Sequence, residues 1–238
     1  MNAAVDLGNS RLKILRTDGH FSAWDVSALE WEQISAFLSP ARRVILSSVN
    51  PRAGGQLERF LRERWNVISA REYLENANLP ITISAVGIGI DRVLGVLGGM
   101  RYRTPPFAVV DIGTALTVTL VDAHYDIRGG FIVPGPLMQL RALQRELTHV
   151  DVPSTLEISN LDIGQSTESA IRAGLCLEII AFIRSVAEFI DRSADTPPVM
   201  FLTGGFSNAI EHLLPRSGMS VHVVPTLVLE GGLTLVDP

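Results

Sequence analysis

Short apolar runs separated by polar turns make up the beginning of the chain. Three of them, at Ala3–Asp6, Arg11–Arg16 and Phe21–Val26, have the length and pattern of strands. Apolar residues at helical spacing then predict a helix over Ala28–Leu38, which Pro40 ends. The pattern continues with a strand, an amphipathic helix and a strand, at Arg43–Val49, Gly55–Trp65 and Asn66–Ser69. The order predicted for this part is βββαβαβ.

The later part of the chain repeats this opening. A helix predicted over Asp91–Tyr102 is followed by Thr104-Pro105-Pro106, which predicts a boundary between two domains, residues 1–104 and 105–238. The elements predicted after it are strands at Phe107–Asp111, Leu116–Val121 and Ile127–Ile132, helices at Leu137–Leu147 and Ser166–Asp191, a strand at Val199–Leu202, a helix at Ser207–Leu214 and a strand at Ser220–Val224. Two βββαβα-like halves predict an α/β protein with duplicated actin-like, ribonuclease H-like domains around a central cleft.

One short phrase occurs in both halves. Val5-Asp6-Leu7-Gly8-Asn9-Ser10 and Val110-Asp111-Ile112-Gly113-Thr114-Ala115 place an aspartate and a glycine at the same offset, each between two predicted strands. An aspartate and a glycine also form an ordinary hairpin end. Two copies in register instead favour a duplicated unit. The glycine allows either a positive φ or a close backbone approach, and such a turn can hold phosphate.

The composition narrows the range of functions. The 238 residues are 47% hydrophobic and 19% charged, which is enough for a sizeable core. The net charge of −5, without a stretch rich in Lys and Arg, argues against a nucleic-acid surface. The single cysteine, Cys176, lies between two leucines and is interpreted as a buried thiol. No apolar run reaches the roughly 18 residues of a membrane span. We expect a cytoplasmic protein with no nucleic-acid partner and no membrane partner.

Four motifs carry a resemblance to a known family. They are Asp6-Leu7-Gly8-Asn9-Ser10, Gly89-Ile90-Asp91-Arg92, Asp111-Ile112-Gly113-Thr114-Ala115 and Gly129-Gly130-Phe131-Ile132-Val133-Pro134-Gly135. With them, the chain resembles the type III pantothenate kinases over nearly its whole length. Weaker matches are Ser166-Thr167-Glu168-Ser169-Ala170, Thr203-Gly204-Gly205 and Leu227-Val228-Leu229-Glu230-Gly231. The resemblance implies ATP-dependent phosphorylation of pantothenate to 4'-phosphopantothenate, the first step of coenzyme A biosynthesis.

Phosphoryl transfer requires the γ-phosphate to be aligned with the acceptor hydroxyl while its charge is neutralised. Asp91 is the expected general base, and Arg92 is expected to hold the acceptor or the migrating phosphoryl group. Asp6 is expected to orient hydrated Mg²⁺, and the resemblance implies K⁺ or NH₄⁺ at Asp111. The residues expected to bind ATP are Asp6, Leu7, Gly8, Asn9, Ser10, Arg11, Leu12, Lys13, Gly113, Thr114, Gly204 and Gly205. Those expected to bind pantothenate are Gly89, Ile90, Asp91, Arg92 and Thr167.

These residues also have purely structural interpretations. Asp91 taken alone is typical of a helix N-cap with Arg92 solvated, and Asp111 of a buried carboxylate that caps its own turn. Similar interpretations exist for Lys13 as a solvated strand residue, for Thr167 as a helix cap, and for Gly204 and Gly205 as a strand-to-helix turn. The five histidines show no metal-ligand spacing, and we assign none of them a catalytic role.

Three segments depart from the family pattern, one of which is Ser166-Thr167 in place of the usual N-T before the long helix. Thr82 stands where the family usually has tyrosine, and Ser84-Ala85 replaces the following Asn-Pro. Ser48-Val49-Asn50-Pro51 stands for the usual S-V-V-P. A nucleotide-binding regulatory relative without kinase activity, and a kinase for another small alcohol or carboxylate, are therefore alternatives. We expect a homodimer, because the predicted helix Ser166–Asp191 has more apolar residues than one stripe needs and because the related kinases pair through their second halves.

Overall fold

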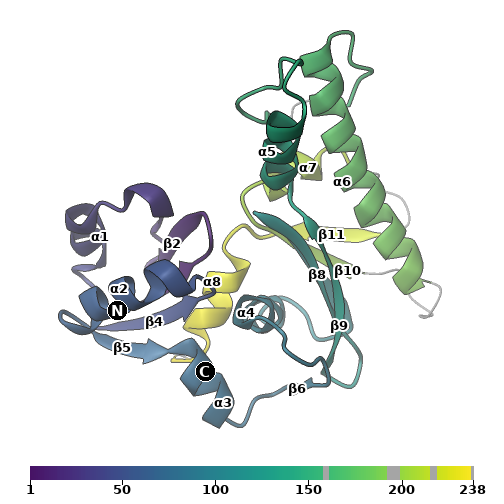
Figure 1. The fold of residues 1–238 in the computed structure, drawn as a ribbon. Helices are drawn as coiled ribbons and strands as arrows, with labels where there is room; N and C mark the ends of the chain where they lie inside the picture. The colour runs from purple at the N-terminus through teal and green to yellow at the C-terminus, as the bar shows by residue number, and fades with distance from the viewer. Residues whose placement is uncertain (158–160, 192–198, 215–218, 237–238) are drawn as a thin grey trace. The chain divides into compact units, whose positions relative to one another are not determined.

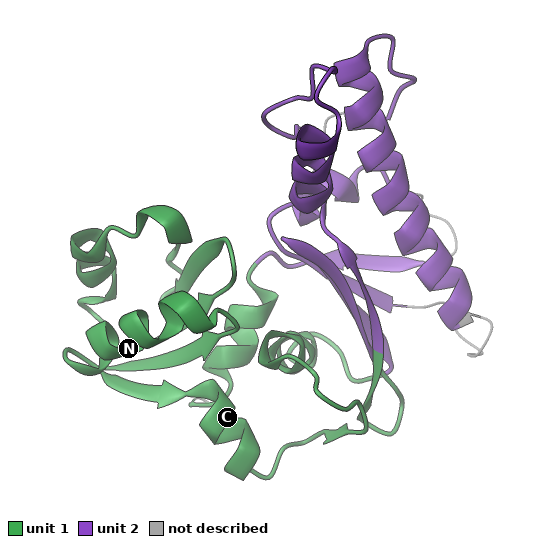
Figure 2. Cartoon of the chain, in the orientation of Figure 1, with its two compact units in different colours: residues 1–105, 121–129, 226–238 green, residues 106–120, 130–225 purple. Residues whose placement is uncertain are grey.

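A computed structural model describes residues 1–157, 161–191, 199–214 and 219–236. The described chain forms a five-stranded and a six-stranded sheet, with helices packed on them (Figure 1). The chain divides into two compact units (Figure 2). The first unit comprises residues 1–105, 121–129 and 226–238, and the second comprises residues 106–120 and 130–225.

The first sheet has the strand order β3-β2-β1-β4-β5. Its strands are β1 (Asn2–Leu7), β2 (Arg11–Arg16), β3 (Phe21–Asp25), β4 (Arg43–Ser48) and β5 (Asn66–Ser69). β1 is antiparallel to β2 and parallel to β4, and β4 is parallel to β5. Because side chains alternate along a strand, Val5 and Leu7 lie on one face of the sheet, and Ala4 and Asp6 lie on the other.

Helices cover both faces of this sheet. α1 (Trp31–Leu38) and α2 (Pro51–Arg62) share a core with Val5 and Leu7 through their buried residues Ile34, Leu38, Leu57 and Leu61. α8 (Leu227–Leu233) packs on the opposite face, where a Cβ added to Gly232 would lie 3.3 Å from that of Ala4. α4 (Ile90–Gly99) packs against α8 and β4.

Glycines allow α4 and α8 to approach each other closely. A Cβ on Gly98 would overlap the carbonyl of Leu227, and a Cβ on Gly231 would overlap the carbonyl of Leu94. The motif from Leu227 to Gly231 is therefore a helix-packing element of the first unit. The compact units thus differ from the expected halves, 1–104 and 105–238, in which this motif lies in the second half. The division into those two domains stays a prediction.

The second sheet has the order β11-β10-β7-β8-β9-β6. Its strands are β6 (Thr82–Ile83), β7 (Phe107–Ile112), β8 (Ala115–Val121), β9 (Asp126–Pro134), β10 (Val199–Thr203) and β11 (Ser220–Val223). β10 is parallel to both β7 and β11. From β9 to β11 the order repeats that from β3 to β5, which confirms the predicted duplication.

Three helices belong to the second unit: α5 (Pro136–Glu146), α6 (Thr167–Asp191) and α7 (Ser207–Glu211). Cys176, Ile179 and Ile183 of α6 are buried in one core with Val110 and Leu202. Cys176 is 2% exposed, as the sequence predicted, and its burial raises the pKa of the thiol. Even α6 lacks the long apolar stretch that a bilayer crossing needs, and the same holds for the other described helices.

Several local elements differ from the predictions. A short helix, α3 (Ala70–Asn76), replaces the polar stretch after β5, and Ser69 caps it by accepting a hydrogen bond from the Glu72 amide. A 3₁₀ turn, η1 (Val26–Ala28), delays the start of α1. α2 begins earlier than predicted, because Pro51 suits the first helical position and Asn50 caps it.

Candidate active site

The turn after β1 is held by bonds to its carbonyl oxygens. The Gly8 amide donates to the Arg11 carbonyl at 2.9 Å, and the Val26 amide donates to the Ser10 carbonyl at 3.0 Å. The Leu7 carbonyl accepts from the Val49 amide at 3.1 Å. Gly8 does not have a positive φ. A Cβ there would lie 3.4 Å from the Arg11 carbonyl oxygen, so close approach is the reason for glycine.

Asn50 connects this turn to the start of α2. Its Nδ2 donates to the Gly8 carbonyl at 3.3 Å, across 42 positions of sequence. Its Oδ1 accepts from the amides of Arg52 and Ala53 at 3.0 and 3.1 Å. The departure from the usual S-V-V-P therefore supplies a side chain that caps a helix and holds the turn at once. Asn50 was not among the site residues expected from the sequence.

A polar row crosses the first sheet at the level of the turn. Asp6 is paired with Lys13 on β2 and with Ser47 on β4, so the three side chains project from the same face. Asp6 is 8% exposed and Ser47 is 3% exposed. Ser47 Oγ is buried and makes no hydrogen bond within the described residues. Lys13 is half-buried, and the strand register puts it beside Asp6.

Asp91 and Arg92 lie in the first turn of α4. The N-cap is Gly89, so the alternative in which Asp91 is the N-cap is wrong. A Cβ on Gly89 would overlap Asp91 Oδ1, the end of a rotatable side chain, so glycine leaves room for this carboxylate in its present position. Both charged residues are half-buried. Burial lowers the pKa of Arg92, and the neighbouring Asp91 opposes that shift.

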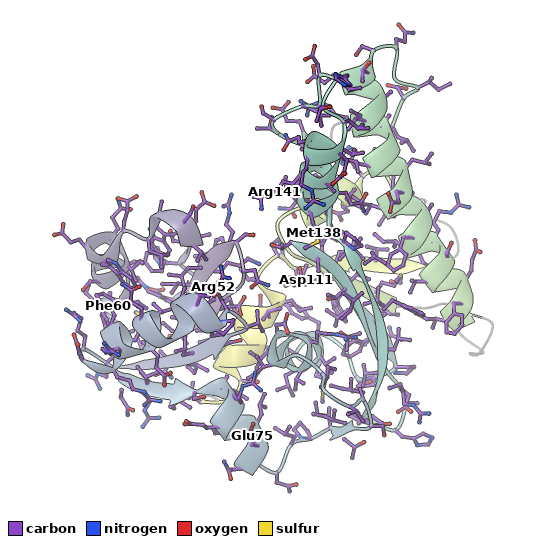
Figure 3. The ribbon with its side chains drawn as sticks, viewed as in Figure 1. Arg52, Phe60, Glu75, Asp111, Met138 and Arg141 are labelled. Carbon is purple, nitrogen blue, oxygen red and sulfur yellow. The ribbon has the colours of Figure 1, made fainter. Side chains whose placement is uncertain are left out.

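In the second unit, separate glycine motifs converge on Asp111 (labelled in Figure 3). Asp111 is paired with Thr203 on β10, which brings Gly204 over its carboxylate. A Cβ on Gly204 would overlap Asp111 Oδ1 and would lie 2.7 Å from the Ile112 carbonyl oxygen. Gly204 also has φ +90°, a conformation that disfavours other residues. Gly204, the first glycine of the T-G-G motif, is therefore required both by close packing and by its positive φ.

The turn after β7 is packed in the same way by Gly135. A Cβ on Gly135 would overlap the Gly113 carbonyl and would lie 2.6 Å from the Thr114 carbonyl oxygen. The Gly135 amide donates to that Thr114 carbonyl at 3.0 Å. Gly113, whose φ is not positive, would place a Cβ 3.3 Å from Asp111 Oδ1. Gly135 belongs to the G-G-x-I-x-P-G motif and was not among the site residues expected from the sequence.

The remaining carbonyls of this second turn are also bonded. The Phe206 amide donates to the Ile112 carbonyl at 3.2 Å, and the Gly113 amide donates to the Ala115 carbonyl at 3.1 Å. Ser207 Oγ donates to the Gly204 carbonyl at 2.8 Å and fixes the strand-to-helix turn before α7. Gly205 is exposed, and an added Cβ would meet nothing within 4 Å.

Two predicted site residues have other surroundings. The Arg11 side chain pairs with Asp25 at 3.1 Å on the surface of the first unit, so its backbone is the part that belongs to the turn. Thr167 is exposed at the first residue of α6, where Ser166 and Ser169 bond to each other across the helix start. Within the described residues, no hydrogen bond joins Thr167 to the other candidates.

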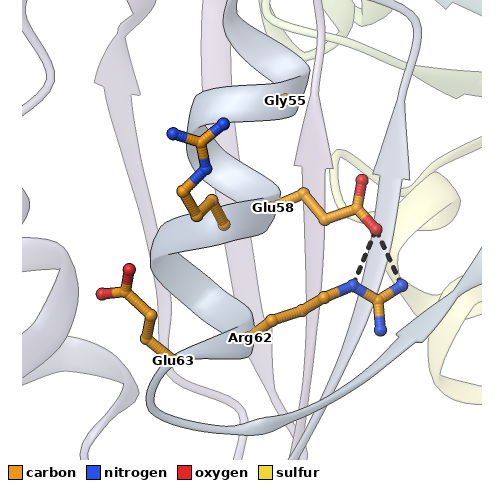
Figure 4. A pocket seen from close by; sticks show the side chains of 5 residues that line it. Gly55, Glu58, Arg62 and Glu63 are labelled. Atoms are coloured by element: carbon orange, nitrogen blue, oxygen red, sulfur yellow. Dashed lines mark hydrogen bonds and ion pairs between the residues drawn. The ribbon is translucent and has the colours of Figure 1, made fainter.

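Two surface pockets of the first unit lie away from these turns. A hollow of 410 Å³ on α2 is lined by Gly55, Glu58, Arg59, Arg62 and Glu63 (Figure 4). Glu58 and Arg62 pair there at 2.7 Å. A second pocket, of 570 Å³, lies beside α8, where Glu230 accepts a hydrogen bond from the Tyr102 hydroxyl at 2.6 Å. Neither pocket is lined by a residue predicted to bind ATP or pantothenate.

Comparison with known proteins identifies the family. Residues 3–189 match the family model of type III pantothenate kinase. The type III pantothenate kinase of Alkalilimnicola ehrlichii is 30% identical over 248 residues, which cover 95% of this chain and 94% of the relative. That of Gluconobacter oxydans is 28% identical over 227 residues, which cover 93% of this chain and 81% of the relative.

Solved structures show the same fold at low sequence identity. A conserved Baf family protein from Campylobacter jejuni superposes with a TM-score of 0.64 at 19% identity, covering 99% of this chain and 97% of that one. The archaeal actin homolog Ta0583 gives 0.52 at 13% identity, covering 99% of each chain. The actin-like fold class is thereby confirmed. The chain belongs to the type III pantothenate kinase family and is a kinase.

Proposed function

We propose that the protein transfers the γ-phosphoryl group of ATP to the primary hydroxyl of pantothenate and forms 4'-phosphopantothenate. The observation that supports this most is shared by the two aspartate-glycine turns. In each, carbonyl oxygens are bonded to neighbouring segments: those of Leu7, Gly8 and Ser10 in the first turn, and those of Ile112 and Thr114 in the second. Carbonyl oxygens repel phosphate, so a turn that engages them elsewhere is suited to present amides to it.

The chemical step is assigned to Asp91 and Arg92. The acceptor oxygen attacks the γ-phosphorus as the bond to the β–γ bridging oxygen breaks, and ADP leaves with that electron pair. A carboxylate of Asp91 takes the hydroxyl proton as general base. The Arg92 guanidinium, which stays charged at neutral pH, neutralises charge on the transferring group. Gly89 leaves room for the Asp91 carboxylate at the helix start.

The polar row of Asp6, Lys13 and Ser47 is the proposed place for hydrated Mg²⁺. Among the described residues, no group of three or more His, Cys, Asp or Glu side chains is arranged to hold a metal by itself. A kinase Mg²⁺ keeps several waters and relies on one or two carboxylates with the substrate phosphates, so the Asp6 carboxylate and the buried Ser47 hydroxyl fit it. The ion would neutralise charge on the phosphates.

Asp111 is the proposed ligand of a monovalent cation, K⁺ or NH₄⁺. Its carboxylate is the kind of hard oxygen donor that such ions prefer, and Gly113 and Gly204 leave room for it against the backbone. The prediction that Asp111 caps its own turn is the structural alternative. Substitution of Asp111 by Asn should weaken activation by K⁺ without lowering the thermal stability.

We also propose a homodimer in the cytoplasm. Leu177 and Phe189 of α6 are 55% and 58% exposed, and Ile132 of β9 is 63% exposed. Phe189 packs its ring against Phe131, with centroids 5.7 Å apart. Such exposed apolar side chains are typical of a surface that a partner covers. Light scattering at micromolar concentration should give twice the chain mass of 25.9 kDa, and glutamate at Leu177 and Phe189 should reduce it to that of one chain.

The central experiment measures ADP release by purified protein with ATP, Mg²⁺ and K⁺, with and without pantothenate. Asp91→Asn should lower turnover by about 10²–10⁴-fold with an unchanged circular dichroism spectrum. The exposed loop variant Asp151→Asn is the matched control and should behave as wild type. If Asp91→Asn stays within a few fold of the wild-type rate, Asp91 is not the base.

The same assay separates the alternatives. Nucleotide binding without pantothenate-stimulated ADP release would indicate the regulatory relative. ADP release with another small alcohol or carboxylate in an acceptor screen, but not with pantothenate, would indicate a kinase of different specificity.

A further inference from the structure

The segment that departs from the family pattern, residues 82–85, is fixed to the start of β9. The Thr82 amide donates to the Tyr125 carbonyl at 2.9 Å, and the Ala85 amide donates to the Ile127 carbonyl at 3.2 Å. Two ladder pairs, Thr82 with Asp126 and Ile83 with Ile127, make this short piece the parallel edge strand β6. All of these residues belong to the first unit.

Asp126 is the side chain at the centre of this attachment. Its Oδ1 accepts from the Ser84 amide at 2.9 Å and from the Thr82 hydroxyl at 3.0 Å. Asp126 is 7% exposed, and Arg128 lies 3.6 Å from its other oxygen. The hydrogen bonds from Ser84, then those from Thr82, and the charge of Arg128 hold the pKa of Asp126 below its ordinary value. The carboxylate is therefore ionised at neutral pH.

The chain between this attachment and the proposed base is short and rich in glycine. Val86 is fully exposed, Gly87 has φ +68°, and Gly89 lies beneath the Asp91 carboxylate. The far end is anchored independently, because α4 packs on α8 through Gly98 and Gly231. The segment from Val86 to Gly89 thus connects two fixed points, the attachment of β6 to β9 and the packing of α4 on α8. Asp126 provides side-chain bonds at the first of these points.

We propose that Asp126 is a positioning residue for the acceptor, because its bonds to Thr82 and Ser84 fix the start of the glycine segment that leads to Gly89 and Asp91. The inference deepens the proposed function and rests on it. Asp126 itself touches no reacting atom in this assignment. Loss of its bonds should loosen the segment before α4 and weaken acceptor binding, while the turn at Gly8 that is assigned to ATP stays in place.

The test compares Asp126→Ala, Thr82→Val and Thr82→Ser with the wild type. The alanine variant removes both bonds, the valine variant removes the one from the hydroxyl at nearly unchanged shape, and the serine variant keeps that hydroxyl. We expect KM for pantothenate to rise about tenfold or more in Asp126→Ala and about threefold in Thr82→Val. KM for ATP should stay within about twofold in all, and Thr82→Ser should match the wild type.

Hydrogen exchange of the full-length chain supplies a readout that needs no turnover. The hydrogen-bonded amides of Thr82, Ser84 and Ala85 should exchange about tenfold faster in Asp126→Ala than in the wild type, with the amides of β1 unchanged. A general loss of stability would instead accelerate exchange throughout the first unit. If Asp126→Ala does not fold, the comparison of Thr82→Val with Thr82→Ser tests the role of Asp126 instead. It uses the same two measurements, KM for pantothenate and hydrogen exchange.

Three outcomes are distinguishable. The role of Asp126 is overturned if the wild type turns over pantothenate and the variants have an unchanged KM for pantothenate. A fall in kcat at constant KM overturns it as well. Unchanged exchange of the amides of Thr82, Ser84 and Ala85 overturns it as well. Wild type that releases no ADP with pantothenate refutes the proposed function instead, and the exchange measurement still decides whether Asp126 fixes the segment.

Discussion

The two aspartate-glycine turns have the same sequence pattern but are held in different ways. The turn after β1 has a side chain in addition to its backbone bonds, because Asn50 reaches the Gly8 carbonyl from the start of α2. The turn after β7 depends on bare backbone, because Gly135 and Gly204 approach it so closely that neither has room for a Cβ. Both arrangements engage carbonyl oxygens. The two copies of the duplicated unit thus bond their turn carbonyls in different ways, one with a side-chain hydrogen bond and the other with closely packed backbone.

This difference predicts different responses to substitution. Adding a methyl group where backbone meets backbone forces the chain itself to move, since close-packed interiors leave no space for it. Removing one hydrogen bond from a side chain costs less and leaves the chain path intact. The second turn should therefore be intolerant of small additions, and the first turn should respond by graded losses.

The largest effect is expected from Gly204→Ala. The new Cβ would meet both Asp111 and the Ile112 carbonyl, and φ +90° adds backbone strain. The free energy of unfolding should fall by about 4 kcal/mol, and ADP release should be lost. Urea unfolding measures the first and a coupled assay the second. The neighbour Gly205→Ala has open space and should change stability by no more than about 0.5 kcal/mol. Equal losses in the two variants would contradict the account.

Gly135→Ala should follow, with a loss of about 3 kcal/mol, because its Cβ would press on the carbonyls of Gly113 and Thr114 without a positive φ to add strain. Its control is Gly174→Ala in α6, where nothing lies within 4 Å and alanine favours the helix. That control should be stabilised by up to about 1 kcal/mol. Thermal unfolding of both variants checks the pair, and a stable, active Gly135→Ala protein would remove the packing argument.

A smaller effect is expected at the first turn from Asn50. Asn50→Ala should raise KM for ATP about tenfold and lower stability by about 1 kcal/mol, since it loses both the Gly8 bond and the α2 cap. Asn50→Ser keeps a capping hydroxyl but is too short to reach Gly8. It should therefore share the KM change with little loss of stability. If Asn50→Ser binds ATP as wild type does, the Gly8 bond is not what holds the turn.

The smallest effect is expected from Tyr102→Phe. This variant is a control, which shows whether a small loss of stability in the first unit is enough to change KM for ATP. The Tyr102 hydroxyl bonds to Glu230 at 2.6 Å, so its removal should cost about 0.5 kcal/mol and leave KM for ATP unchanged. A change in that KM would weaken the comparison.

This same bond has a defined pH dependence. Although the Tyr102 side chain is half-exposed, desolvation of its hydroxyl and then the bond to Glu230 raise its pKa to about 12, above the value near 10 of an unfolded tyrosine. A raised pKa means that the stabilisation is fully present below about pH 10 and is lost as the pH rises through about 12. The difference in unfolding free energy between wild type and Tyr102→Phe should shrink over that range in urea titrations, whereas a constant difference would contradict the assignment.

The sequence predicted the succession of the main strands and helices along both halves, because alternation of apolar residues and glycine turns is a local signal. It also gave Asp6, Asp111 and the Gly89–Arg92 motif, since these carry their chemistry in short phrases. Neither α3 nor β6 was predicted from the sequence, and for β6 the reason is physical. β6 is two residues long and exists through its bonds to β9, which no local pattern encodes.

By itself, the sequence determined the family, the duplicated fold and the candidate residues of each turn. Tertiary structure alone decided that Asn50 holds Gly8, that Gly135 and Gly204 leave no room around Asp111, and that Leu227 to Gly231 pack with the first unit. The reason is that local periodicity specifies each element, whereas contacts between segments distant in sequence depend on how the elements pack.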